Sequence, residues 1–204
     1  MYTFARAIHL MYQYSRNVLF YYPFVKKFEG KFLVLNPIYF TPKYFVFGKN
    51  VFVRDHARLE GVDEYMKDRF SPLIFFGHNV SIEQNFHLTC AGRIEIGSNT
   101  AIAANVTVTD INHPYEDPSI SPEFQNIQIK EVLIGEDCKI YNNAVILPGT
   151  RLGKHCIVGA NTVVTGKAYP AYSVIVGSPS RIIKRYNFET NLWTKTNEIG
   201  DFIN

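Results

Sequence analysis

One histidine of this 204-residue sequence stands where a regular pattern stops. His113 follows Asp110 and Asn112 and directly precedes Pro114. A neutral imidazole can take a proton from an attacking nucleophile, and a neighbouring carboxylate can hold it in one tautomer. A histidine beside a proline is commonplace in loops, so its setting decides its importance. We take His113 as a candidate general base and Asp110 as a candidate supporting residue.

The sequence around His113 repeats an apolar residue every six positions. The clearest run is Ile134, Ile140, Ile146, Leu152, Val158, Val164, Val176 and Ile182, with Pro170 in the one remaining slot. Upstream copies read Phe76, Ile82, Leu88, then Ile96, Ile102, Val108, and more weakly Phe47, Val53, Leu59. Helices repeat every three or four residues and strands every second, so a period of six predicts a short strand and a tight turn. The predicted fold is an all-β parallel solenoid.

The columns between the apolar positions predict a triangular coil of three six-residue units. Successive coils should stack about 4.8 Å apart. One column is glycine: Gly77, Gly97, Gly135 and Gly153. Asn and Asp tolerate a left-handed backbone, and we expect them at two corners. The corner columns are Asn50, Asn79, Asn99 and Asp137, then His56, Asn85, Asn105, Asn143 and Asn161.

Composition favours a single domain with a sizeable core. The chain is 47% hydrophobic and carries a net charge of +3, without a concentrated basic stripe that would predict nucleic-acid binding. It has three Cys, an odd number that does not suggest a disulfide framework. Cys138 and Cys156 fall in an inward column one coil apart. We interpret them, with Cys90, as reduced core thiols, which indicates the cytoplasm.

The chain divides into three parts around two lapses of the repeat. Residues 1–44 form a helical capping segment, residues 45–183 the solenoid, and residues 184–204 a tail with a short helix around Trp193. The lapses at about 60–74 and 112–132 predict loops. Polar residues interrupt the N-terminal helix, so we expect neither a transmembrane span nor a signal peptide. We expect it to cap the first coil; a peripheral membrane contact is the alternative, because aromatic residues accompany Arg16, Lys26 and Lys27.

The pattern resembles the hexapeptide-repeat acyltransferases, which fold as a left-handed β-helix. The resemblance covers roughly residues 45–185. It is sharpened by Val-Thr-Asp-Ile-Asn-His-Pro ending at residue 114, by Ile-Gly at 134–135, and by Gly-Ser-Pro-Ser-Arg at 177–181. The most similar branch contains the maltose, galactoside and capsule or O-antigen O-acetyltransferases. It implies acetyl-CoA as donor, a sugar hydroxyl of a surface polysaccharide as acceptor, and His113 as the base for direct attack on the thioester.

The resemblance also implies other site residues. The family has an Asn one coil before its His, and the corresponding position here is Glu83; Glu83 could orient His113 or bind the acceptor, or Asn85 could take the polar role. Candidate acceptor contacts come from the residues themselves: Tyr115, Glu116 and Asp117 lie in the loop that directly follows His113, and His87 could line the acceptor cleft or face solvent. Coenzyme contacts fall on Asn142, Ala160, Thr165, Gly166, Lys167, Arg181 and Lys184, of which the cationic side chains suit phosphate groups.

A homotrimer with active sites between subunits is implied, located in the cytoplasm or at the inner face of the membrane. An amino-sugar N-acetyltransferase would use the same solenoid and donor, and the sequence barely separates the two. A metal enzyme of the γ-carbonic-anhydrase type needs three convergent His, but His78, His87 and His113 lack that spacing, so we expect no metal. A non-catalytic scaffold would leave the interruption at His113 unexplained. The acceptor sugar and its carrier stay open.

Overall fold

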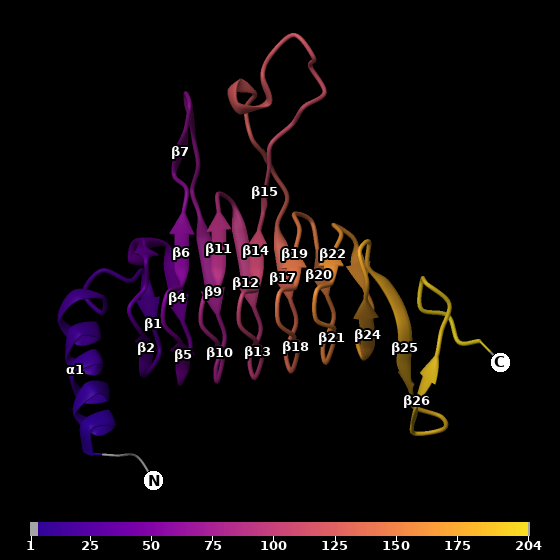
Figure 1. Cartoon of the computed structure of the whole chain (residues 1–204), viewed down its shortest axis with the longest axis horizontal. Helices are drawn as coiled ribbons and strands as arrows, with labels where there is room; N and C mark the ends of the chain where they lie inside the picture. Colours follow the sequence, from indigo (N-terminus) through magenta and orange to yellow (C-terminus); the bar gives the residue numbers. More distant parts are fainter. Residues whose placement is uncertain (1–3, 204) are drawn as a thin grey trace.

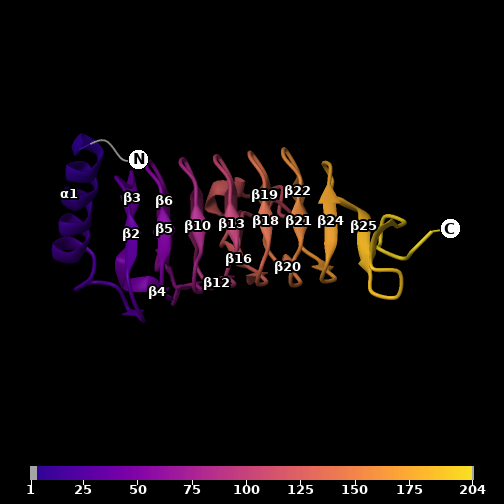
Figure 2. The same cartoon turned by 90° about the horizontal axis from the view of Figure 1, so that it is seen from below.

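Three parallel sheets form the sides of a prism in the computed structural model, which describes residues 4–203 (Figures 1 and 2). Sheet A contains β1 (Lys27–Phe28), β4 (Phe45–Phe47), β9 (Leu73–Phe76), β12 (Arg93–Ile96), β17 (Val132–Ile134), β20 (Arg151–Leu152) and β23 (Ala168–Tyr169). Sheet B contains β2 (Phe32–Val34), β5 (Val51–Val53), β10 (Ser81–Ile82), β13 (Ala101–Ile102), β18 (Lys139–Ile140), β21 (Ile157–Val158) and β24 (Ser173–Val176). Sheet C contains β3 (Tyr39–Phe40), β6 (Arg58–Gly61), β11 (His87–Cys90), β14 (Thr107–Thr109), β19 (Val145–Ile146) and β22 (Val163–Val164). The predicted left-handed β-helix is confirmed.

The apolar side chains that recur every six residues point into the prism, as predicted. In sheet B, Ile102 pairs with Ile82 on one side and Ile140 on the other, and Ile140 pairs with Val158. None of these four side chains is more than 1% exposed. Burying one such side chain stabilises a fold by about 1.5–3 kcal/mol, so the repeat supplies the core along its whole length.

The side chains of the corner columns form ladders of hydrogen bonds that run from coil to coil. Asn50, Asn79, Asn99 and Asp137 adopt φ angles of 55–59°. Each Asn amide donates to the next coil, over 3.2, 3.0 and 3.0 Å. A Cβ atom on Gly97 would lie 2.6 Å from the carbonyl carbon of Gly135, so the coil spacing leaves room only for glycine in that column.

The solenoid begins earlier than the sequence analysis indicated. Residues 27–40, expected to belong to the cap, form a further coil of β1, β2 and β3. Phe28, Val34 and Phe40 have the six-residue spacing and stand in register with Phe47, Val53 and Leu59. The short 3₁₀ helix η1 (Pro42–Tyr44) connects this coil to the next.

The last coil is one residue shorter than expected. Leu152 pairs with Tyr169, and Val158 pairs with Ile175, so these two residues fill the inward slots predicted for Pro170 and Val176. The N–H of Lys167 donates to the carbonyl of Thr165 over 2.8 Å, and this three-residue turn shortens the corner.

The tail also differs from prediction. The prediction of a helix around Trp193 is wrong, because β25 (Arg181–Asn187) and β26 (Leu192–Lys195) form an antiparallel hairpin there. β25 pairs with β24, and this pairing satisfies the last edge of sheet B.

Two excursions leave the same edge of the prism (Figure 1). The first is a small hairpin of β7 (Glu64–Tyr65) and β8 (Asp68–Arg69). The second is a long loop whose stem is the antiparallel pair β15 (Ile111–Asn112) and β16 (Gln128–Ile129), with the 3₁₀ helix η2 (Pro122–Phe124) near its tip. The first falls within its predicted lapse and the second begins one residue before its own, and both contain short strands where only loops were expected.

Helix α1 (Phe4–Phe20) covers the open N-terminal end of the prism (Figures 1 and 2). The side-chain amide of Asn17 donates to the Val34 carbonyl over 3.0 Å, and its oxygen accepts from the Val34 N–H over 2.8 Å. Asn17 thereby provides hydrogen-bond partners for the backbone at the outer edge of β2, the first strand of sheet B. The predicted N-terminal cap is confirmed. Within residues 4–203, no helix is long and apolar enough to cross a bilayer.

Candidate active site

A cavity of about 540 Å³ lies between sheet C and the two excursions. Its floor is made by outward side chains of β6, β11 and β14, and its walls come from the β7–β8 hairpin and the long loop. The residues that matter for its chemistry are Glu60, Tyr65, His87, Thr89, Thr109 and His113. The cavity is hydroxyl-rich and carries two imidazoles and carboxylates, which is a suitable lining for a polar, hydrogen-bonding molecule.

The floor follows from the strand period. Leu88 and Val108 point inward and are fully buried, so Thr89 and Thr109 must point outward. Their hydroxyls are hydrogen-bonded across the two coils, with Thr89 Oγ1 donating to Thr109 Oγ1 over 2.9 Å. The stack therefore presents two ordered hydroxyl groups at the base of the cavity.

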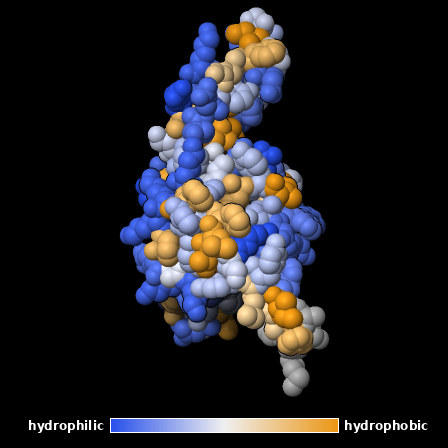
Figure 3. All heavy atoms as spheres, turned by 90° about the vertical axis from the view of Figure 1, so that its left-hand side faces the viewer, coloured by the Kyte–Doolittle hydropathy of each residue, from blue (hydrophilic) through white to orange (hydrophobic). Residues whose placement is uncertain are grey.

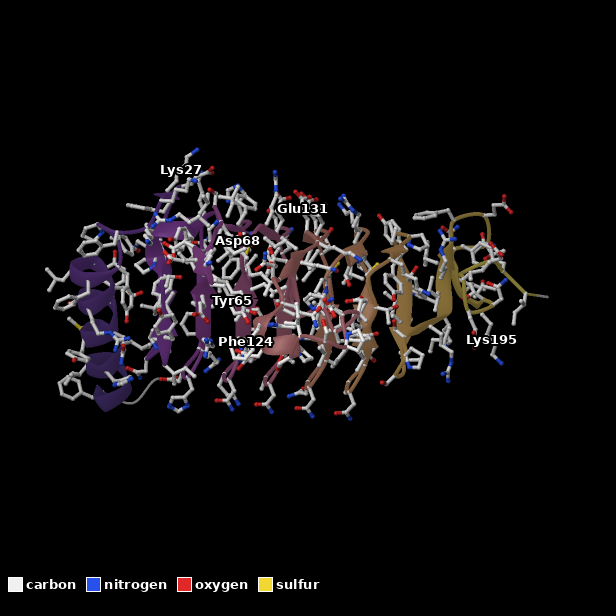
Figure 4. The ribbon with its side chains drawn as sticks, turned by 90° about the horizontal axis from the view of Figure 1, so that it is seen from above. Lys27, Tyr65, Asp68, Phe124, Glu131 and Lys195 are labelled. Carbon is white, nitrogen blue, oxygen red and sulfur yellow. The ribbon has the colours of Figure 1, made fainter. Side chains whose placement is uncertain are left out.

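His113 lies exposed at the mouth of this cavity and rests against Tyr65. The two rings meet edge to face, with centroids 5.4 Å apart and an interplanar angle of 76°. The Tyr65 hydroxyl donates to the Glu123 carbonyl in the long loop over 2.6 Å. Figure 4 looks down on the excursions and shows Tyr65 and the neighbouring Phe124 lying close together. One tyrosine thus links the hairpin, the loop and the candidate base.

Asp110 is buried below the loop. Its carboxylate accepts from the N–H groups of Ala91 and Gly92 over 2.9 and 2.8 Å, and from the Cys90 thiol over 3.3 Å. Burial raises the pKa of the Asp110 carboxyl despite these donors, which act to lower it. Within residues 4–203, no hydrogen bond joins Asp110 to His113. Asp110 anchors the base of the loop.

His87 lines the same cavity on the floor side. Burial lowers the pKa of its imidazole, and the nearby Arg58 guanidinium lowers it further, while Glu60 has the opposite effect. The Arg58 Nε donates to Glu60 over 2.7 Å. These effects favour the neutral form of His87, in which one ring nitrogen can accept a hydrogen bond.

The other predicted catalytic and acceptor residues lie elsewhere. Glu83 forms an ion pair with Arg54, 2.8 Å between Nε and Oε2, and Asn85 donates to Asn105 in its corner ladder. Tyr115, Glu116 and Asp117 are exposed in the long loop and do not line this cavity. The structure brings together His113 and His87 from the predicted set.

Sequence reasoning missed several residues of the cavity. Tyr65 lies in the first lapse, which was interpreted only as an exposed loop. The signal for Thr89 and Thr109 was present, because each follows a six-residue slot and must therefore face outward. No sequence signal brings Tyr65 to His113, because the two excursions meet only in the folded chain.

The residues expected to contact a coenzyme lie in three places. Asn142 and Ala160 lie at the corner between sheets B and C. Thr165, Gly166 and Lys167 lie at the other edge of sheet C. Arg181 and Lys184, on β25, line a second cavity of about 330 Å³ together with Lys195. The Glu198 carboxylate also lines this hollow, and the three cationic side chains are suitable partners for phosphate groups.

Comparison with known proteins agrees with this geometry. The sequence profile described as "Bacterial transferase hexapeptide (six repeats)" matches residues 131–166. A relative in Escherichia coli (strain K12), named "Putative lipopolysaccharide biosynthesis O-acetyl transferase WbbJ", is 39% identical over 130 residues, which are 60% of this chain and 66% of the relative. The chain belongs to the hexapeptide-repeat transferases. The family prediction is thereby confirmed.

A further relative supports the family, and a solved structure supports the fold. The galactoside O-acetyltransferase of Escherichia coli (strain K12) is 33% identical over 124 residues, 57% of this chain and 59% of the enzyme. The N-acyltransferase AntD from Bacillus cereus, solved as a mutant with dTDP and coenzyme A, superposes with a TM-score of 0.66 at 18% identity, over 87% of this chain and 91% of AntD. This hexapeptide-repeat protein spans about two thirds or less of the length of the two O-acetyltransferases.

Proposed function

We propose that this chain is an acetyl-CoA-dependent O-acetyltransferase that acts on a sugar hydroxyl in surface-polysaccharide assembly, of capsule or O-antigen. The observation that carries the proposal is the position of His113 at the mouth of a hydroxyl-lined cavity. The names of WbbJ and of the galactoside enzyme support acetyl transfer to a sugar oxygen.

His113 is the general base of the proposed reaction. Its imidazole takes the proton from the acceptor hydroxyl, which becomes nucleophilic enough to attack a thioester carbonyl; such a base contributes typically about 10²–10⁴-fold. The same imidazolium then returns the proton to the departing thiolate. The edge of the Tyr65 ring limits how far the imidazole can turn. Neutral His87 and the hydroxyls of Thr89 and Thr109 hold the acceptor by hydrogen bonds.

Acetyl-CoA fits the cationic hollow at the other end of the solenoid. When bound, it supplies the acetyl group as a thioester. Arg181 and Lys184, with Lys195, would hold its phosphates, because guanidinium and ammonium groups form charge-assisted hydrogen bonds to phosphate oxygens. Asn142, Ala160, Thr165, Gly166 and Lys167 are proposed to line the path toward His113.

A homotrimer is the proposed assembly. Five of the proposed coenzyme contacts occupy the two edges of sheet C, so neighbouring prisms that each contribute one edge would enclose a groove between them. His113 is exposed in the single chain, and a neighbour would exclude water from it. We place this enzyme in the cytoplasm, where reduced core thiols persist.

The decisive experiment compares His113→Ala with His78→Ala, which removes an exposed imidazole outside the cavity. Thiol release from acetyl-CoA is measured with a panel of bacterial surface sugars. We expect His113→Ala to fold normally and to lose at least about a hundredfold in kcat/KM, with the control unchanged. A loss below about tenfold removes His113 from the base role.

The nature of the product distinguishes the proposed reaction from its alternative. Alkali-labile acetyl esters are expected. If only amino sugars respond and the acetyl group resists mild alkali, the chain is an N-acetyltransferase. Light scattering tests the assembly, and a fully active monomer contradicts the trimer.

A further inference from the structure

The outward face of α1 is apolar although the helix lies at the surface. Six side chains at helical spacing are 39–83% exposed: Phe4, Ile8, Met11, Tyr12, Val18 and Leu19. Their spacing places them along one face of the helix. Figure 3 looks onto this end of the molecule and shows apolar side chains gathered at its centre and toward the lower right. A surface helix normally turns such a face toward the core, so this arrangement is inverted.

The inversion is held in place by the polar face. Gln13 and Asn17 are 1% and 0% exposed. Gln13 donates to the Asn36 side-chain oxygen over 3.0 Å, and Arg16 donates to the same oxygen over 2.8 Å. Rotating the helix to bury its apolar face would break these bonds and the two that join Asn17 to Val34, and each unmet buried group costs about 1–3 kcal/mol. The helix is therefore fixed with its apolar side outward.

The charges beside this face are mainly positive, and the first carboxylate of the chain is Glu29, 4.0 Å from the Lys27 ammonium. Residues 1–28 contain no Asp or Glu. Exposed Phe20 and Phe24 extend the apolar surface toward Lys26 and Lys27, which are also exposed. Figure 4 shows Lys27 projecting from the side of the prism next to α1. A second copy docked face to face would bring the same lysines together, whereas phosphate headgroups would complement them.

We propose that α1 docks this protein on an anionic lipid surface. The apolar face enters the boundary between headgroups and acyl chains, and Lys26 and Lys27 meet the lipid phosphates. The buried polar face keeps the helix attached to the prism. The N-terminal end of the prism then faces the membrane, and the rest of the prism extends away from it.

This orientation brings the candidate active site near the lipid. The cavity spans β6, β11 and β14, the second to fourth coils from α1. With about 4.8 Å between coils and about 10 Å for the helix, it lies within roughly 25 Å of the bilayer. The docking itself does not depend on the proposed reaction.

The test is flotation of the whole protein with phosphatidylcholine vesicles, with and without phosphatidylglycerol. The test variant is Ile8→Gln/Met11→Gln/Leu19→Gln. Its matched control is Leu192→Gln/Ile199→Gln, two residues 65% and 71% exposed in the C-terminal tail. We expect wild type and control to float with the anionic vesicles, and the test variant to bind at least about tenfold more weakly. Lys26→Gln/Lys27→Gln should weaken binding to the anionic vesicles and reduce its salt dependence.

Two results overturn the proposal. One is failure of the wild type to bind anionic vesicles, or equal binding by the test variant. The other is a dimer in solution that the test variant dissociates, which assigns the face to a second copy. Circular dichroism and the melting temperature establish that the test variant retains its fold. Acetyl transfer to a soluble acceptor should be the same in wild type and test variant, so loss of docking and failure of the proposed reaction are distinguishable.

Discussion

The Tyr65 ring lies edge to face against the His113 imidazole, with 5.4 Å between the ring centroids. Tyr65 belongs to the β7–β8 hairpin and His113 to the long loop, so two excursions separated by two coils define one wall of the cavity. The bond from the Tyr65 hydroxyl to the Glu123 carbonyl adds a second link between them. Tyr65 is thus placed to position the candidate base without touching the floor of the cavity.

Replacing Tyr65 should affect catalysis more than folding. Tyr65→Leu removes both the ring edge and the hydroxyl, and we expect kcat to fall by about 10–100-fold because the imidazole loses its orientation. Tyr65→Phe keeps the ring and should restore most of kcat. Lys67→Ala, in the same hairpin, is the control. If Tyr65→Leu raises KM alone, the residue binds the acceptor and does not position His113.

Asp110→Asn should destabilise the protein. The Asn amide would have to face the N–H of Ala91 or Gly92, which leaves a buried donor unmet at about 1–3 kcal/mol. Denaturant unfolding measures this loss. Asp117→Asn, an exposed change in the loop, should leave the free energy of unfolding almost unchanged.

Asp110 also gives the free energy of unfolding a pH dependence of known sign. Its pKa is raised in the folded state, so its contribution is fully present below the unfolded pKa of about 3.9. That contribution falls as pH rises through the folded pKa. Subtracting the Asp110→Asn curve from the wild-type curve isolates the slope, and a difference curve that rises with pH would contradict the assignment.

The His87 pKa should respond to its charged neighbours. Burial and then Arg58 lower this pKa, so Arg58→Gln should raise it and Glu60→Gln should lower it, each measured by NMR titration. Because the folded pKa is depressed, the contribution of His87 to stability is present above about pH 6.5 and is lost as pH falls through the folded pKa. Equal titration in all three proteins would show that Arg58 and Glu60 do not act on His87.

The three cysteines should be inert in the native protein. Cys90, Cys138 and Cys156 are free and at most 2% exposed. Burial raises the pKa of Cys90, and contact with Cys156 together with burial raises that of Cys138, whereas contact with Cys138 lowers the pKa of Cys156. We therefore expect the burial of all three thiols to keep reagents away from them. Ellman's reagent should detect three thiols only after unfolding in guanidinium. Rapid labelling of a native thiol would contradict the packed interpretation.

Arg181→Gln/Lys184→Gln should weaken donor binding. We expect the KM for acetyl-CoA to rise about tenfold or more with kcat nearly unchanged, because phosphate contacts contribute equally before and during the reaction. The rise should shrink at high salt, where the wild type also loses affinity. Lys49→Gln, at the opposite end of the prism, is the control.

The six-residue period determined the fold, the inward residues and both Asn ladders, because a solenoid repeats the same local environment in every coil. Even the missed first coil was encoded, in Phe28, Val34 and Phe40. The inward positions of the last coil were wrongly assigned because the tight turn from Thr165 to Lys167 makes this coil one residue shorter. The six-residue spacing of the sequence gives no sign of that shortening.

The site was only half predictable. His113 could be found because it stands at a break in the repeat, and Thr89 and Thr109 must face outward beside inward Leu88 and Val108. Only the tertiary structure decided that the β7–β8 hairpin and the long loop meet over the cavity. The Tyr65 ring contacts His113, whereas the Asp110 carboxylate accepts hydrogen bonds from Ala91 and Gly92. Helix α1 buries Asn17 and leaves Met11 exposed. Non-local contacts and the competition of buried polar groups for partners set these relationships, and neither is written in the spacing of residues along the chain.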